Sequence, residues 1–285
     1  MNKDLSYDKT SIQSIFEYSK RLIGNSLRDV VSEDVVDASR LRGQGKGGLG
    51  QMIEELFFQY PVNSDPGPDF REAHLELKAT GLKSEKEGGL QIKERLVCDM
   101  LDYCSIVNTP FESSLFYLKC RIMLLIFYLY EKGIDKLDLK FIYTVVWQLP
   151  EKDLLIIKND FETFINKIKN GEAHNLSEGD TEYLGACRKG QKGDNLRAQP
   201  FSDVRAPKRA LSLKPAYMRT VLAYVKSRGV SAVSNIDFPN ITKEIATVDE
   251  LKSVSFENLI LQRFQPWIGQ SVSNYVQVPP PRLRI

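Results

Sequence analysis

The sequence predicts an α/β protein of one large domain or two lobes, because segments with helical and strand patterns alternate along its 285 residues. Runs rich in apolar, β-branched and aromatic residues predict strands at 75–80, 95–103, 121–130 and 137–149, with a partner segment around Asp69 for the first. Apolar residues spaced for one helix face predict helices at 11–27, 49–60, 151–168, 215–227 and, in part, 248–275.

The other segments lack a clear pattern. Residues 170–214 form a long polar and basic stretch with little periodicity, which we interpret as a functional loop. Residues 229–247 are weakly patterned, and residues 276–285 are predicted to be a tail.

The positive charge is concentrated in one part of the chain. The formal net charge is only +2, but between Ala186 and Arg228 the only acids are Asp194 and Asp203. The bases there are Arg188, Lys189, Lys192, Arg197, Arg205, Lys208, Arg209, Lys214, Arg219, Lys226 and Arg228. Such a stretch suits either a phosphate backbone or a solvated basic surface, and composition alone leaves both interpretations open.

Cysteine usage and the N-terminus predict a soluble, cytoplasmic protein without a membrane partner. None of the four cysteines forms a Cys-x-x-Cys pair, which favours free thiols in a reducing compartment. With two histidines a zinc site is not expected. The N-terminus has no apolar signal region, and the longest apolar run, Ile122 to Tyr130, is too short to span a bilayer.

The segment from Asp69 to Lys78 carries the chemistry. The alternation from His74 to Lys78 is typical of a strand with one buried face, so Glu76 and Lys78 project from the same face. Together with Asp69 and the Leu77 carbonyl, this patch can hold Mg²⁺, which prefers oxygen ligands and lowers the pKa of a bound water. A solvated edge strand with alternating charge would give the same pattern, so the motif alone is weak.

Several further motifs, in the same order along the chain, resemble the MutH and Sau-type GATC endonuclease family, and the later ones resemble its Sau-type restriction branch in particular. The resemblance covers roughly residues 11–273. It is carried by Gly47–Glu54, Pro68-Asp69, Leu75–Ala79, Lys93–Val97, Glu172–Gly179, Tyr183–Gly190, Arg197–Val204, Arg209–Lys214, Tyr217-Met218 and Phe264–Pro266.

The resemblance implies a restriction-endonuclease-like fold, an α/β structure in which a mixed sheet flanked by helices forms two arms around a DNA cleft. The catalytic arm would be about residues 1–150 and the DNA-reading arm about 151–275. The implied catalytic residues are Glu54, Asp69, Glu76 and Lys78, with Mg²⁺ held by Asp69, Glu76 and Leu77. Glu54 is preferred to Glu55 because Gly50-x3-Glu54 matches the family spacing.

The same resemblance implies contacts with double-stranded DNA. Arg188 and Lys189 occupy the place of the base-reading loop, and arginine or lysine to guanine is the commonest specific contact. The other expected DNA-binding residues are Lys46, Gly47, Lys93, Arg95, Arg197, Lys208, Arg209 and Lys214.

The implied function is a type II restriction endonuclease that cuts duplex DNA at GATC with Mg²⁺ and leaves a 5′-phosphate. A homodimer on the palindromic site and a cognate DNA methyltransferase are the expected partners. Two alternatives stay open: a strand-selective nickase of the mismatch-repair type, activated by a partner protein, and a DNA-binding domain without cleavage.

Overall fold

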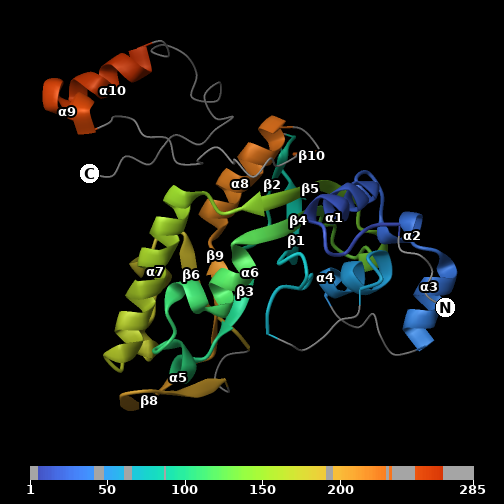
Figure 1. The fold of residues 1–285 in the computed structure, drawn as a ribbon, viewed down its shortest axis with the longest axis horizontal. Coiled ribbons are helices and arrows are strands. Elements are labelled where there is room, and N and C mark those ends of the chain that lie inside the picture. The colour runs from blue at the N-terminus through green and yellow to red at the C-terminus, as the bar shows by residue number, and fades with distance from the viewer. Residues whose placement is uncertain are drawn as a thin grey trace.

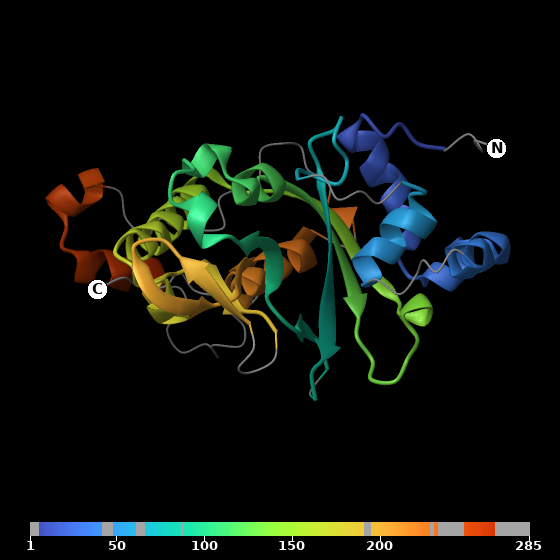
Figure 2. The ribbon, with the colours of Figure 1, turned by 90° about the horizontal axis from the view of Figure 1, so that it is seen from below.

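The computed structural model describes residues 6–41, 48–60, 66–86, 88–190, 195–228, 231–232 and 248–265. Figures 1 and 2 show a central sheet with one arm on each side of it. The N-terminal arm is built from short helices: α1 Ile12–Ser19, η1 Lys20–Leu22, α2 Leu27–Val30, α3 Glu33–Leu41, α4 Leu49–Met52 and the π-helical turn η2 Ile53–Phe57.

The central sheet is mixed, which confirms the predicted fold class. Its strand order is β10-β5-β4-β1-β2, where the strands are β1 Glu76–Ser84, β2 Leu90–Ile92, β4 Ile122–Leu129, β5 Phe141–Gln148 and β10 Ser231–Ala232. β1 runs parallel to β4, in a register that pairs Glu76 with Met123, whereas β5 and β2 are antiparallel to their neighbours β4 and β1. β4 is almost continuously apolar because both faces of the sheet are covered at this strand.

The second arm contains a three-stranded sheet of order β3-β9-β6 and a two-stranded hairpin, β7–β8. Helices and turns complete the arm, with α7 alongside β6 (Figure 1). The remaining elements are β3 Leu96–Leu101, α5 Tyr103–Ile106, η3 Phe111–Ser113, α6 Leu115–Cys120, η4 Lys136–Asp138, α7 Glu151–Lys169, η5 Ala173–Asn175, η6 Glu178–Asp180, β6 Leu184–Arg188, β7 Leu196–Gln199, β8 Ser202–Pro207, β9 Arg209–Leu213, α8 Pro215–Arg228, α9 Val248–Ser253 and α10 Phe256–Phe264.

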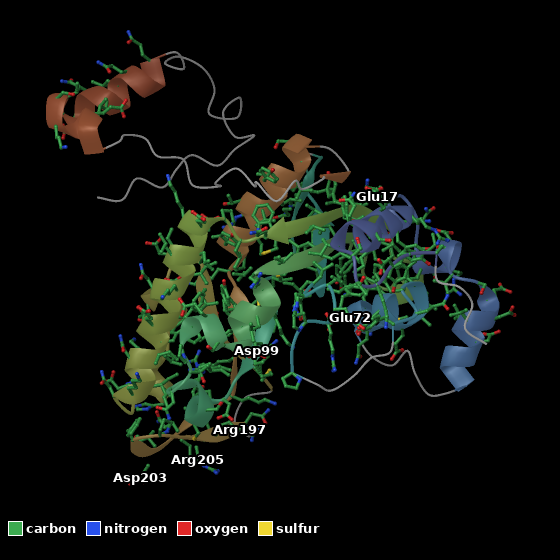
Figure 3. The ribbon with its side chains drawn as sticks, viewed as in Figure 1. Glu17, Glu72, Asp99, Arg197, Asp203 and Arg205 are labelled. Atoms are coloured by element: carbon green, nitrogen blue, oxygen red, sulfur yellow. The ribbon has the colours of Figure 1, made fainter. Side chains whose placement is uncertain are left out.

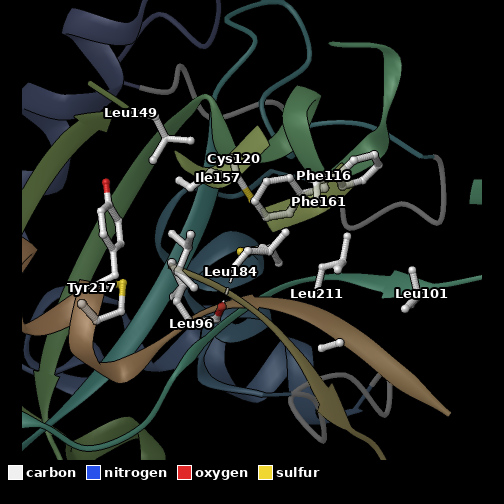
Figure 4. Close-up of a cluster of buried hydrophobic side chains, with 14 of the residues drawn as sticks. Leu96, Leu101, Phe116, Cys120, Leu149, Ile157, Phe161, Leu184, Leu211 and Tyr217 are labelled. Carbon is white, nitrogen blue, oxygen red and sulfur yellow. Dashed lines mark hydrogen bonds between the residues drawn. The ribbon is translucent and has the colours of Figure 1, made fainter. Parts of the chain in front are cut away.

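Two hydrophobic clusters lie on opposite faces of the central sheet. On β4, Leu124 and Ile126 pack with the N-terminal helices, whereas Met123, Leu125 and Phe127 pack into the cluster of the second arm. In that second cluster, leucines from three strands meet aromatic rings from α6 and α7 (Figure 4). Buried residues between Leu96 and Cys120, before residue 150, also belong to this second cluster. The division into arms near residue 150 therefore stays a prediction, since the clusters do not follow chain order.

The structure confirms the helices predicted at 151–168 and 215–227 and the strands predicted at 95–103 and 121–130, within a few residues at each end. The helix predicted over 11–27 ends at Ser19 and continues as a 3-10 turn, and the strand predicted from residue 137 begins at Phe141. Helices α9 and α10 bear out the partly helical character of 248–275 as far as Phe264. The tail at 276–285 lies outside the described residues.

The interpretation of 170–214 as a loop was wrong, because this stretch contains β6, β7, β8 and β9. These strands are only four to six residues long. In β7 and β8 the apolar residues Leu196 and Val204 are exposed, so apolar residues do not mark a buried face there. In β6 two of the four buried residues are the small Gly185 and Ala186, which carry little hydrophobic signal. In the part of the chain that the structure describes, no helix is both long and apolar enough to cross a membrane.

A buried carboxylate on α7 anchors the start of β6. Asp160 accepts hydrogen bonds from the backbone N–H groups of Glu182, Tyr183 and Leu184, at 2.9, 2.7 and 2.9 Å.

We predict that Asp160→Ala lowers the free energy of unfolding in urea by about 3 kcal/mol, because three backbone donors lose their acceptor. The matched control is Glu162→Ala, an exposed carboxylate on the same helix, which should change stability by less than about 0.5 kcal/mol. Equal effects of the two changes would contradict this role.

Candidate active site

A tight reversal of the chain brings Asp69 next to β1. Phe70 and Leu75 exchange two backbone hydrogen bonds of 2.9 and 3.1 Å, and His74, at the end of the turn, adopts a left-handed backbone with φ of 51°. As a result the Leu77 N–H donates to Asp69 Oδ2 at 2.9 Å. The predicted strand pair is reduced to this single bridge just before β1, because the strand partners of β1 are β2 and β4.

Glu76 and Lys78 project from the same face of β1 and form a buried ion pair. Lys78 Nζ lies 2.5 Å from Glu76 Oε1, and the two side chains are 19% and 2% exposed. The other carboxylate oxygen of Glu76 accepts from the Asp69 N–H at 3.2 Å. The three residues that the sequence places in the metal patch are therefore brought together in one hydrogen-bonded group.

Burial and neighbouring charges together set the protonation of Glu76 and Lys78. It raises the pKa of the Glu76 carboxyl, while the Lys78 ammonium opposes that rise and Asp69 adds to it. Burial would lower the pKa of Lys78, but the neighbouring acidic groups, Glu76 foremost, outweigh burial and the pKa is raised. Lys78 therefore stays a cation beside a carboxylate that is costly to ionise.

Glu54 reaches the same group from the other side. It lies in the π-helical turn η2, a local widening of the helix that is frequent at functional sites. Its side chain is buried, and burial, followed by the charges of Asp69 and Glu76, raises its pKa to about 7. Glu55, which the sequence offered as an alternative, is only half-buried. Glu54 is thus a carboxyl group able to exchange a proton near neutral pH.

The oxygen donors suit a hard divalent cation better than a soft one. Asp69 and Glu76 supply carboxylates, and the Leu77 carbonyl belongs to the same stretch of backbone. Mg²⁺ needs only one or two protein carboxylates, because waters and substrate phosphate complete its octahedron. Within the described ranges no three His, Cys, Asp or Glu side chains form a compact metal-holding group.

A cavity of about 460 Å³ connects Lys78 with the end of β6. Among the charged residues of its lining, the basic ones predominate. They are Lys78, Arg95, Arg188 and Lys189, and the acidic one is Glu94. Arg95 is held by an ion pair with Glu178. The expected base-reading residues Arg188 and Lys189 therefore line the same cavity as Lys78.

Two expected phosphate contacts have structural roles instead. Arg209 is 4% exposed, and its guanidinium donates to the carbonyls of Ala186 and Leu176, both at 2.6 Å. This corrects its assignment to the DNA surface, because no phosphate can reach a buried guanidinium already bonded to the backbone. Lys214 is also used internally, since its ammonium donates to the carbonyls of Glu178 and Thr181.

The other expected contacts differ in position. Lys93 pairs with Glu94 at 3.1 Å and stacks over Tyr130, at 4.4 Å from the ring centroid. Arg197 is exposed on β7 and Lys208 is half-buried just after β8. Lys46 and Gly47 lie outside the described residues.

Two neighbours of the site escaped the sequence analysis. Thr80 follows Lys78 on the same face of β1, lines the cavity and is 2% exposed, so the alternation of the strand could have indicated it. Asp99, labelled in Figure 3, comes from β3 of the other sheet; its pKa is raised by burial, against the opposing charges of Lys119 and Lys78. Only the tertiary structure brings Asp99 near Lys78, so no local sequence pattern could have indicated it.

Comparisons with known proteins agree with this arrangement. Residues 58–160, which include Asp69, Glu76 and Lys78, match the family model described as DNA mismatch repair enzyme MutH. The chain is 35% identical over 258 residues to the type II restriction enzyme Sau3AI of Staphylococcus aureus, a match that covers 89% of this chain and 51% of that protein. Both matches support the resemblance to the MutH and Sau-type endonuclease family. It spans about half the length of Sau3AI.

A relative named for MutH shows a weaker match to this chain. The DNA mismatch repair protein MutH of Buchnera aphidicola subsp. Baizongia pistaciae (strain Bp) is 23% identical over 177 residues, which is 62% of this chain and 79% of that protein. The greater extent and identity of the Sau3AI match agree with the Sau-type motifs of the sequence.

The raised pKa of Glu54 predicts a pH-dependent stability difference. An unfolded glutamate ionises near pH 4.5, but the folded protein resists ionising Glu54 until about pH 7, so this group destabilises the fold as pH rises through that window. Glu54→Gln should therefore gain stability relative to the wild type between about pH 5 and about pH 8 in metal-free urea titrations. The control Glu55→Gln removes the same charge from a half-buried neighbour and separates burial from net charge. A difference independent of pH would contradict the buried, charge-coupled state of Glu54.

Proposed function

We propose that this chain is a type II site-specific endonuclease that hydrolyses phosphodiester bonds of duplex DNA at GATC with Mg²⁺. One observation carries the proposal: Lys78, which is ion-paired with Glu76 beside Asp69, lines the same cavity as Arg188 and Lys189. A group that can act on a phosphodiester thus shares a cavity with groups that can read a base. The restriction function named for Sau3AI supports the same choice.

The residues would divide the work by their charge and position. Asp69, Glu76 and the Leu77 carbonyl would hold the cation, which would supply an activated water and offset charge on the phosphate oxygens. Lys78, kept cationic by Glu76, would face the scissile phosphate and stabilise its developing negative charge. Glu54, with a pKa of about 7, would take a proton from the attacking water.

The base-reading role falls to the end of β6. Arg188 is exposed and Lys189 is half-buried on the cavity wall. Arg209 supports this strand end from beneath through its bond to the Ala186 carbonyl. We propose that this fixed strand end presents Arg188 to a guanine edge in the major groove.

The proposed substrate implies the partners. GATC is palindromic, and cutting both strands calls for two active sites, which two copies of the chain would supply. A DNA methyltransferase acting on the same sequence would complete a restriction system. Such a system works where the cell's DNA lies, so we propose a cytoplasmic protein.

Cleavage of a supercoiled plasmid bearing GATC sites, with Mg²⁺ and with or without adenine methylation, tests the proposal. We expect linear fragments that end at GATC and carry 5′-phosphates. Open circles alone, stimulated by a partner protein, would favour the nickase of the mismatch-repair branch instead, and binding without cleavage would contradict any endonuclease role. Cleavage unrelated to GATC would contradict the proposed specificity alone.

Isosteric variants test the site itself. Glu76→Gln and Asp69→Asn should each lower the cleavage rate by about 10³-fold, since they remove charge where the transition state needs it. The matched control is Glu72→Gln, an exposed carboxylate in the turn between Asp69 and Glu76, which should cut at the wild-type rate. Circular dichroism checks that each variant is folded. Full activity of Glu76→Gln would remove the site assignment.

A further inference from the structure

The β7–β8 hairpin is fixed to its arm by a buried side-chain amide. Gln199 is 6% exposed, and its Oε1 accepts from the Ala173 N–H at 2.7 Å. Its Nε2 donates to the Val204 carbonyl across the hairpin and lies 3.0 Å from His174 Nδ1. One amide therefore joins β7, β8 and the turn after α7, which ties the hairpin to its arm.

The tip of the hairpin has an unfavourable backbone conformation that its surroundings enforce. Phe201 has a φ of 62° although it is a bulky residue, and its side chain is 72% exposed. The left-handed conformation costs such a residue about 1–2 kcal/mol. Gly171, with a φ of 74°, packs so closely that a Cβ there would lie 2.6 Å from the Phe201 carbonyl oxygen. The tip is thus a rigid, exposed structure rather than a loose turn.

Two arginines on this rigid hairpin have no partners in the described part of the chain. Arg197 and Arg205 are exposed, and neither forms a hydrogen bond or ion pair with any residue that the structure describes. Figure 3 labels both at the hairpin, together with Asp203. Asp203 is the acidic residue between Leu196 and Pro207. An unpaired guanidinium offers several fixed donors, a geometry that matches phosphate.

The base of the hairpin is hydrogen-bonded to the strand end at the cavity. The Lys208 N–H donates to the Asn195 carbonyl at 2.6 Å, and the Lys189 N–H donates to the Lys208 carbonyl at 2.8 Å. The hairpin is therefore an extension of the same wall that carries Arg188 and Lys189. Figure 2 shows the hairpin on the side of the arm that faces the viewer from below.

We propose that the β7–β8 hairpin is a second DNA-contacting surface, which binds the sugar-phosphate backbone of the duplex outside the cavity through Arg197 and Arg205. This inference rests on the proposed endonuclease function, because it takes the duplex to be bound at Arg188 and Lys189. It adds a contact with flanking DNA that is independent of base sequence. Such contacts fix the position of the protein on the duplex without reading it.

The charge of the hairpin decides between DNA and a second copy of the chain. A two-fold interface through this surface would bring together two hairpins of net positive charge, because both subunits use the same patch. Duplex DNA meets the same guanidiniums with a regular array of phosphates. The exposed Phe201 and Val204 can pack on the apolar faces of deoxyribose beside them.

The test uses Arg205→Ala, because Arg205 lies outside the proposed active site. Fluorescence anisotropy would measure binding to two GATC duplexes, one of about one helical turn and one of about three. Ca²⁺ replaces Mg²⁺ in this assay to limit cleavage. We expect the wild type to bind the longer duplex more tightly, and Arg205→Ala to lose about tenfold on the long duplex only. For this variant on the long duplex, the slope of the logarithm of the binding constant against the logarithm of the salt concentration should fall in magnitude by about one.

Controls distinguish DNA binding by the hairpin from protein binding by the same surface and from the proposed endonuclease function. Arg219→Ala removes an exposed arginine on α8 and should bind both duplexes as the wild type does. Equal binding of the long duplex by Arg205→Ala and the wild type would overturn the proposal, as would an equal loss on both duplexes. A change in oligomeric state by sedimentation, with unchanged DNA binding, would assign the surface to a protein partner instead. If the wild type fails to cut GATC but keeps the length-dependent binding, the hairpin surface stands and the cleavage function falls.

Discussion

The buried ion pair of Glu76 and Lys78 on β1 is the constraint around which the site is built. A carboxylate that is 2% exposed, on a central strand, is unfavourable unless its oxygens are satisfied. One oxygen is bonded to Lys78 and the other to the Asp69 backbone, which in turn requires the reversal of the chain at Phe70–Leu75. Breaking such a pair costs about 3–5 kcal/mol, whereas apolar residues would stabilise the strand at least as well. The pair therefore indicates function more than stability.

The position of the site follows from the two hydrophobic clusters. β1 and β4 are shared between them, so alternate residues of β1 face different clusters: Leu77 packs with the N-terminal helices and Leu82 with the second arm. Glu76, Lys78 and Thr80 lie on the second face, where the cavity separates β1 from the β3 and β6 strands. Charged groups are tolerated there because the packing of the two arms leaves an opening.

Some parts of this arrangement follow from local pattern and others do not. The alternation from His74 to Lys78 sufficed to put Glu76 and Lys78 on one face, because strand periodicity is geometric. The role of Arg209 could not be predicted, since a buried arginine that bonds carbonyls looks in sequence like a surface base. Family spacing singled out Glu54, but the π-helical turn that carries it has no sequence signature. The short strands β6 to β9 were hidden because buried leucines alternate there with small residues and with polar ones such as Arg209 and Ser212, within a stretch rich in charge.

Binding of a divalent cation to the protein without DNA tests the central claim most directly. Calorimetric titration with Mn²⁺, which shares the oxygen ligands of Mg²⁺, would be run at about pH 6.5 and about pH 8 in buffers of different ionisation enthalpy. Because the pKa values of Glu54 and Glu76 are raised, binding should release protons at the lower pH and fewer at the higher. Asp69→Asn should weaken binding at both. Proton release that does not change with pH, or unchanged affinity in Asp69→Asn, would contradict a cation site formed by these carboxylates.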